Sequence, residues 1–245
     1  HGLDPIVRRN EFKLFGILNG IDTDSYNPET DRSVFSHYSA ENIEPKKRCK
    51  EELQKMFNLP VKPDTPVIAV ISRLVAHKGL DLVRAVIEEV LRQDVQVIIL
   101  GKGDSAYENY FTDLARRYVG KFVAVIAFNP DLSRKIYSGA DLFLMPSKSE
   151  PCGLSQMIAS RYGAVPIVRE TGGLYDSIKP VGNGGNGYTF ANYNAYDMLY
   201  VIREALNDYN NREEWQKLVK RVMSVDFSWS RSAKEYEKMY GEMLR

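Results

Sequence analysis

A carboxylate beside a strand-to-helix turn is the feature of this sequence with the clearest chemical meaning. Glu150 follows the apolar run 142–145 and precedes Pro151 and Gly153, after which a helical pattern begins. Such a turn can aim backbone N–H groups and one carboxylate at the same small space. An anionic leaving group could rest on the N–H groups while Glu150 faces the reacting atoms. A solvated loop carboxylate is the usual fate of a glutamate, but the flanking Pro-Cys-Gly favours a built turn.

Two cations follow an earlier strand-like run. Arg73 and Lys78 lie in the loop after residues 66–71, where they could clamp a diphosphate and stabilise the charge of its departure. For an isolated pair of cations, two solvated surface charges are the commoner outcome. Thr171, Gly172 and Gly173 follow a later strand and could present N–H groups to phosphate, although a glycine pair is more often a simple turn.

Two further side chains admit two interpretations each. Phe128 could stack on a base or cap the core, and the sequence favours the cap. Cys152 could be a nucleophile, but no histidine lies near it in the sequence, and packing is the preferred role. Lys102, between two glycines, indicates little.

Strands and helices alternate through most of the chain. This alternation predicts right-handed βαβ units and a Rossmann-like, doubly wound parallel sheet, an α/β fold. The expected strands are 66–71, 95–100, 122–127, 141–145 and 165–168, and the expected helices are 46–57, 79–92, 105–118, 132–138 and 154–162. Three helices are expected from Ala195 onward, with Trp215, Phe227 and Trp229 as packing anchors.

The sheet topology predicts where the functional side chains meet. Ligands of such sheets bind beyond the carboxyl ends of the strands. We therefore expect one rim to gather the residues that follow strand ends, namely Arg73, Gly101, Phe128, Glu150 and Thr171.

Bulk properties exclude several classes of protein. The 245 residues carry 33 Lys plus Arg against 32 Asp plus Glu, so no basic field predicts a nucleic-acid partner. Cys49 and Cys152 are far apart and lack metal-ligand spacing, which predicts no disulfide framework and a reducing compartment. Apolar runs fall short of the roughly 20 residues that cross a bilayer, so no membrane partner is expected. No Gly-x-Gly-x-x-Gly opens a βαβ unit, and the sequence has no Walker-type Gly-Lys-Ser/Thr loop, which argues against dinucleotide and P-loop chemistry.

Taken together, the motifs resemble the bacterial glycogen synthase and plant starch synthase family. The matching stretches span nearly the whole chain in the family's order: GILNGID (16–22), SRLVAHKGLDL (72–82), LMPSKSEPCGLSQ (144–156), RYGAVPIVRETGGLYDS (161–177) and DFSWSRSAKEY (226–236). The resemblance implies a retaining glucosyltransferase of the GT-B type, which has two Rossmann-like domains around a cleft. It also implies ADP-glucose as donor, an α-1,4-glucan as acceptor, and neither a metal nor a cofactor. The expected location is the cytoplasm in bacteria or the plastid in plants.

The resemblance also assigns roles to residues. Arg73 and Lys78 correspond to the pair that holds the donor diphosphate, and Glu150 to the acidic residue at the donor glucose. The remaining positions correspond to donor-binding residues: Cys152, Gly153 and Leu154 at the sugar, Ser155, Thr171, Gly172 and Gly173 at the phosphates, Phe128 beside the adenine, and Asn19 in the linker near the sugar. His77 stands where the family commonly has Gln, and Ser155 where it has Thr.

The family's N-terminal motif, Lys-x-Gly-Gly-Leu, does not occur in this sequence. We therefore expect the C-terminal, donor-binding half of such an enzyme, nearly inactive alone, with the acceptor bound mainly by the other half. The expected divisions are the end of the N-terminal domain and linker (1–22), a nucleotide-sugar-binding domain (23–225) and a C-terminal helix (226–245). Two alternatives stay open: a retaining GT-B transferase that uses a UDP-sugar, and a non-catalytic nucleotide-sugar-binding module.

Overall fold

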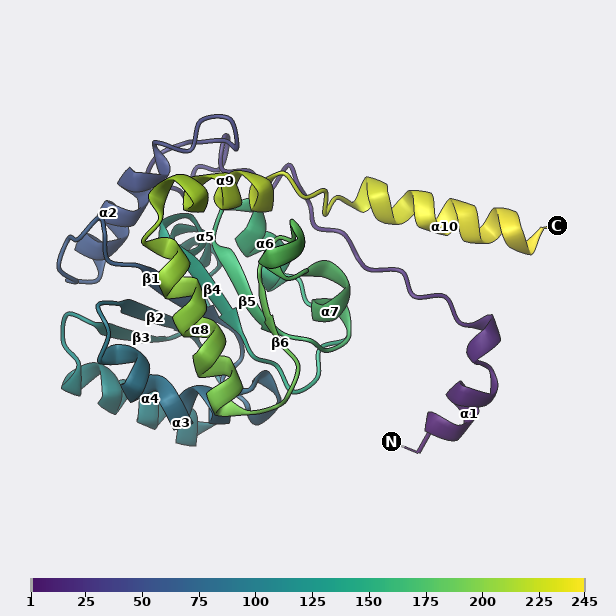
Figure 1. Cartoon of the computed structure of the whole chain (residues 1–245), viewed down its shortest axis with the longest axis horizontal. Coiled ribbons are helices and arrows are strands. Elements are labelled where there is room, and N and C mark those ends of the chain that lie inside the picture. Colours follow the sequence, from purple (N-terminus) through teal and green to yellow (C-terminus); the bar gives the residue numbers. More distant parts are fainter. Residues whose placement is uncertain (1, 245) are drawn as a thin grey trace.

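A six-stranded parallel sheet forms the centre of the computed structural model, which describes residues 2–244 (Figure 1). The strand order β3-β2-β1-β4-β5-β6 reverses direction between β1 and β4, so the chain winds outward twice from the middle. The predicted Rossmann-like, doubly wound sheet is confirmed. The strands are β1 (Val67–Ile71), β2 (Gln96–Gly101), β3 (Phe122–Ile126), β4 (Leu142–Met145), β5 (Val165–Arg169) and β6 (Tyr188–Phe190).

The central strands are apolar along their whole length because helices cover both faces of the sheet. Residues 67–70 of β1 are at most 2% exposed, and all of β4 is buried. Ile68 of β1 is in register with both Val97 of β2 and Leu142 of β4. The carboxyl ends of these neighbouring strands therefore lie at one edge of the sheet.

Helices pack in two layers against this sheet. Helix α8 crosses in front of the sheet in Figure 1 and packs against α3, while α5 lies behind the sheet against α2. The bounds are α2 (Lys46–Met56), α3 (Leu80–Leu91), α4 (Ser105–Arg117), α5 (Pro130–Gly139), α6 (Ser155–Arg161), α7 (Gly173–Ser177), α8 (Ala195–Tyr209) and α9 (Arg212–Met223). Short 3₁₀ turns are η1 (Glu11–Lys13), η2 (Ala76–Lys78) and η3 (Val181–Asn183).

Local sequence signals explain where these helices begin. The Asn129 side chain accepts a hydrogen bond from the Leu132 N–H, and Pro130 occupies the first turn of α5. Asn194 caps α8 in the same way. Such caps satisfy N–H groups that have no partner within the helix. The predicted strands and helices agree with the observed bounds within two residues, while α1 (Asp4–Arg9), α7 and β6 were not predicted.

The segment before α2 is bound to the sheet and its covering helices, which we call the body, through the buried carboxylate of Asp31. Asp31 accepts hydrogen bonds from Arg134 of α5, at 3.0 Å, and from the hydroxyl of Tyr162. Arg134 also donates to Ser25, and the Tyr38 hydroxyl donates to the Tyr162 carbonyl at 2.8 Å. These contacts hold residues 25–38 against the C-terminal end of α6.

Two terminal segments leave this body. The segment with α1 (Asp4–Arg9) and the helix α10 (Trp229–Met243) both project away from it in Figure 1. Trp215 and Phe227 are buried as predicted, but Trp229 is 50% exposed, so its predicted role as a packing anchor is wrong. It begins α10, which lies outside the body. The predicted division into 1–22, 23–225 and 226–245 stays a prediction.

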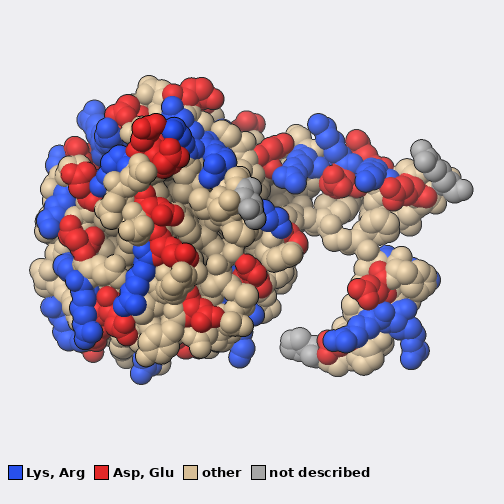
Figure 2. Space-filling view, viewed as in Figure 1, with Lys and Arg blue, Asp and Glu red and all other residues tan. Residues whose placement is uncertain are grey.

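Surface charge is mixed. Lys and Arg alternate with Asp and Glu across the face drawn in Figure 2. Within residues 2–244, no helix combines the length and the apolar character that crossing a membrane requires.

Candidate active site

The loops after β1 and β4 meet at the carboxyl edge of the sheet. Lys78 Nζ donates to Glu150 Oε2 at 2.5 Å, and the Ser147 hydroxyl donates to the same oxygen at 3.2 Å. Glu150 is 8% exposed, and the Lys78 side chain is 16% exposed. The two predicted charged residues therefore form a largely buried ion pair at the expected rim.

The backbone brings these two loops into direct contact. The Lys148 N–H donates to the His77 carbonyl at 2.9 Å. A Cβ atom at Gly79 would lie 1.9 Å from the Pro146 carbonyl oxygen, closer than any side chain can approach. Arg73 lies in the same loop and is exposed, and its Nη2 atom lies 3.4 Å from His77 Nε2.

Residues 149–154, which we call the acidic turn, pack on residues 171–173, the glycine turn that follows β5. The Gly173 N–H donates to the Glu150 carbonyl at 3.0 Å. A Cβ atom at Gly172 would lie 2.2 Å from that carbonyl oxygen, and one at Gly173 would lie 2.1 Å from the Cys152 oxygen. Glycine is required at both positions because the two backbones touch. The predicted proximity of Thr171–Gly173 to the acidic turn is thus present.

Several backbone donors of these turns point at no protein acceptor. Within the described residues, the N–H groups of Cys152, Gly153, Leu154 and Gly172 make no hydrogen bond to backbone or side chains. Leu154 is 46% exposed and Cys152 is partly buried. Unpaired N–H groups around a carboxylate are able to bind the oxygens of a ligand.

A cavity of about 390 Å³ opens beside this region. Arg73, Lys102, Phe128, Tyr137 and Ser155 are among the residues that line it. Phe128 is 88% exposed, so the core-capping role that the sequence favoured is wrong, and the aromatic ring is free to stack on a planar ligand. The cavity lies past the ends of β1, β2 and β3, where an open parallel sheet binds ligands.

Asn19 lies in the linker and does not line the cavity beside Phe128. Asn19 lines a different cavity together with Met157 of α6 and Asp176 of α7, and it is not among the residues around Phe128. The linker runs along α10, as the hydrogen bond from Ser232 to the Leu18 carbonyl at 2.7 Å indicates. Met157 and Asp176 belong to the helices that follow the turn with Glu150 and the turn with Gly172, and the predicted place of Asn19 near the sugar stays a prediction.

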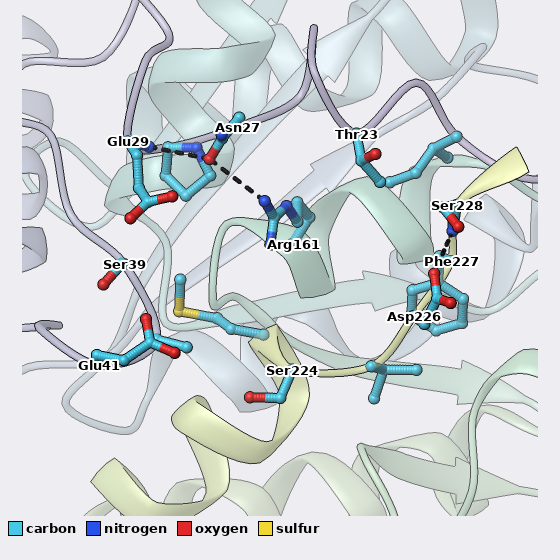
Figure 3. A pocket seen from close by; sticks show the side chains of 15 residues that line it. Thr23, Asn27, Glu29, Ser39, Glu41, Arg161, Ser224, Asp226, Phe227 and Ser228 are labelled. Carbon is cyan, nitrogen blue, oxygen red and sulfur yellow. Dashed lines mark hydrogen bonds between the residues drawn. The ribbon is translucent and has the colours of Figure 1, made fainter. Parts of the chain in front are cut away.

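A larger polar cavity, of about 500 Å³, is separate from the rim (Figure 3). Arg161, the last residue of α6, points into it and donates to Asn27 at 3.3 Å. Since α6 leads from the end of β4 to the start of β5, this cavity lies toward the opposite edge of the sheet. It contains none of the predicted site residues.

Three contributors to the site were not predicted. Ser147 donates to Glu150, and His77 contacts Arg73. Gln156 is completely buried beneath the acidic turn. Of these three residues, only Gln156 could have been predicted from the sequence. An amide side chain between a glycine turn and the apolar pattern of a helix needs hydrogen-bond partners within the protein.

No cofactor or metal was expected, and that expectation stays a prediction. Within residues 2–244, no group of three or more His, Cys, Asp and Glu side chains is arranged to hold a metal ion. The two cysteines, Cys49 and Cys152, are not disulfide-bonded.

Comparisons with known proteins agree with this geometry. Residues 51–222 match the family model described as "Glycosyl transferases group 1". The chain is 48% identical over 245 residues to a glycogen synthase of Bacillus cereus and 49% identical over 246 residues to one of Clostridium acetobutylicum, covering 99% of this chain and 52% of each relative. The chain thus spans about half the length of the curated relatives it matches.

Solved structures give the same picture. The catalytic domain of starch synthase IV from Arabidopsis thaliana, bound to ADP and acarbose, superposes with a TM-score of 0.92 at 36% identity, over 98% of this chain and 51% of that one. Sucrose-phosphate synthase from Thermosynechococcus elongatus, at 20% identity and TM-score 0.67 over 98% of this chain and 56% of that one, shares the fold. The predicted fold class, a Rossmann-like half of a GT-B glycosyltransferase, is confirmed. The chain belongs to the group 1 glycosyl transferases, and the relatives it resembles within that family include glycogen synthases and a starch synthase.

Proposed function

We propose that this chain is the donor-binding half of a glycogen synthase. The whole enzyme would transfer glucose from ADP-glucose to the non-reducing end of an α-1,4-glucan with retention of configuration. The observation that carries the proposal is the contact between Lys78 and Glu150 at the same rim as the Arg73–Phe128 cavity. That rim offers two cations, a carboxylate, unpaired N–H groups and an exposed aromatic ring, which together match the parts of a sugar nucleotide.

Each part of the donor has a counterpart. The adenine would stack on Phe128, since an exposed aromatic ring suits any base. Arg73 and Lys78 would hold the diphosphate, and the acidic turn with Glu150 would hold the glucose. The Arabidopsis starch synthase IV structure, which contains ADP, supports ADP as the nucleotide.

In the reaction, the bond between glucose C1 and the diphosphate breaks, and a bond forms between C1 and the acceptor hydroxyl oxygen. The proton of that hydroxyl leaves with the diphosphate or with solvent. Arg73 and Lys78 stabilise the negative charge that grows on the leaving group, which lowers the barrier as well as aiding binding. Glu150 orients the glucose. Cys152 packs against the glycine turn, and transfer proceeds without a covalent enzyme intermediate and without a metal.

The other half of the enzyme would complete the site. Large apolar side chains are exposed on the two terminal segments, for example Phe12 at 80% and Met243 at 73%. Apolar surface of this kind marks an interaction site, and in a protein as long as the curated relatives it would contact the remaining half. The glucan acceptor would bind mainly there, so this chain alone would bind the donor and transfer little. We place the enzyme in the cytoplasm, as unpaired cysteines favour.

Titration calorimetry of the 245-residue chain with ADP, ADP-glucose, UDP and GDP tests this proposal. We expect ADP and ADP-glucose to bind and UDP and GDP to bind more weakly, with no change when EDTA is added. Tighter binding of UDP would favour the alternative of a UDP-sugar transferase. Absence of binding to every nucleotide would contradict the proposed donor site. Unchanged glucosyl transfer by a Glu150→Ala variant of the full-length enzyme would refute its catalytic role.

A further inference from the structure

Gln156 joins the two turns of the proposed donor site from beneath. Its side chain is completely buried in the first turn of α6. The Nε2 atom donates to the Gly153 carbonyl at 2.9 Å, to the Ser177 hydroxyl at 3.0 Å and to the Cys152 carbonyl at 3.2 Å. One amide group thus binds the acidic turn on one side and α7, which follows the glycine turn, on the other.

The chemistry of these partners fixes the orientation of the amide. The carbonyl groups of Cys152 and Gly153 can only accept hydrogen bonds. The Ser177 hydroxyl donates its hydrogen to the Gly173 carbonyl at 2.6 Å. The Ser177 oxygen therefore also acts as an acceptor toward Gln156. The two hydrogens of the Gln156 amide nitrogen therefore face three acceptor oxygens. If the amide were rotated by 180°, its oxygen would face these three oxygens without a hydrogen between them.

The hydrogen bonds of the Gln156 amide, which we call the clamp, determine the direction of the unpaired N–H groups in the acidic turn. In a trans peptide, the carbonyl of one residue and the N–H of the next point in opposite directions. Because Gln156 draws the carbonyls of Cys152 and Gly153 inward, the N–H groups of Gly153 and Leu154 face the other side of the turn. These are two of the N–H groups that find no acceptor among the described residues.

Gly153 lies directly against the Gln156 amide, and only glycine fits there. Gly153 has φ +74°, and a Cβ atom there would lie 2.5 Å from Gln156 Oε1. A side chain at position 153 would therefore both strain the backbone and displace the amide.

We propose that Gln156 is a positioning residue for the glucosyl part of the donor. It acts through the peptide planes of residues 152–154 and presents the N–H groups of Gly153 and Leu154 to the sugar. The inference rests on the proposed function, because it requires a sugar at the acidic turn. The nucleotide part depends mainly on Arg73 and Phe128, which Gln156 does not contact, so the clamp affects binding of the sugar more than binding of the nucleotide.

The variant Gln156→Glu tests the clamp because it keeps the shape but leaves at most one donor, on a protonated carboxyl, for the three acceptors. Calorimetry should show the Kd for ADP-glucose rising about tenfold or more, a loss of about 1.4 kcal/mol or more, with the Kd for ADP changed less than about twofold. Ser177→Ala removes one acceptor and should raise the Kd for ADP-glucose about threefold. Ser160→Ala is the matched control: it removes a buried hydrogen bond to the Gln156 carbonyl at 2.8 Å without touching the amide, and both affinities should stay unchanged.

The outcomes separate the two proposals. Equal weakening of ADP and ADP-glucose in Gln156→Glu, or unchanged ADP-glucose affinity, would overturn the clamp while leaving the donor site intact. Should Gln156→Glu fail to fold, Ser177→Ala decides, and an unchanged affinity for ADP-glucose in that variant would overturn the clamp. A wild-type chain that binds neither ligand would overturn the proposed function and the clamp with it.

Discussion

Lys78 Nζ and Glu150 Oε2 lie 2.5 Å apart although 72 residues separate them in the sequence. They meet because β1 and β4 are neighbours at the point where the strand order reverses. The loops that follow these two strands consequently share one rim. Both side chains are largely withdrawn from water, so each depends on the other for charge compensation.

Breaking this ion pair should destabilise the chain. In Lys78→Met, the Glu150 carboxylate would stay buried with Ser147 as its remaining partner, and the free energy of unfolding should fall by about 3 kcal/mol. Urea unfolding at pH 7 measures this change. Lys47→Met is the control, because Lys47 and its partner Glu44 are exposed and little change is expected. Equal midpoints for the three proteins would contradict the buried pair.

Removing the exposed aromatic ring should weaken nucleotide binding without affecting the fold. Phe128→Ala should lower the affinity for ADP by about 1–3 kcal/mol, the usual contribution of a base stacked on an aromatic side chain. The melting temperature should stay constant, since Phe128 is 88% exposed. Calorimetry with ADP checks this, with Phe12→Ala, another exposed phenylalanine, as control. An unchanged affinity in Phe128→Ala would exclude stacking.

Arg73 should contribute to phosphate binding and not to base binding. Arg73→Gln is expected to weaken ADP by about 1.5–3 kcal/mol, the contribution of a hydrogen bond to a charged group, and to leave adenosine unaffected. Competition of both ligands against a fluorescent nucleotide gives the two affinities. Arg84→Gln, a charge change on α3, should alter neither. Parallel losses for ADP and adenosine would show that Arg73 shapes the cavity and does not hold the diphosphate.

Acid should release the segment before α2. Burial raises the pKa of Asp31, but hydrogen bonds from Tyr162, Ser33 and Arg134 outweigh it, so the net pKa lies below its ordinary value of 3.8. The stabilisation is therefore fully present above pH 3.8 and is lost as the pH falls below that value through the folded-state pKa. Unfolding free energies of Asp31→Asn, measured from pH 6 to 2.5, should fall less steeply in acid than those of wild type. Asp113→Asn should follow wild type, and a steep acid loss in Asp31→Asn would contradict the assignment.

The strands and the rim could be predicted because they depend on local composition. Runs such as 67–71 are apolar and β-branched, which suits strands covered on both faces, and the carboxyl edge of a parallel sheet gathers whatever follows its strands. The contact between Lys78 and Glu150 follows from that rule. Their roles in donor binding stay proposals.

Other features depend on tertiary contacts that no local pattern encodes. Phe128 was expected to cap the core, but its loop carries it into the open cavity. Trp229 looked like an anchor, yet it begins a helix outside the body. The partners of Gln156 come from two turns whose approach is visible only in the folded chain. The short elements α7 and β6 are too brief to give a periodic signal.

The most direct test of the donor site is a crystal structure of the chain with ADP-glucose. We predict the adenine against Phe128, the diphosphate at Arg73 and the glucose at the turn that carries Glu150. A sugar nucleotide bound in the polar cavity around Arg161, or at any other place away from this rim, would contradict the account.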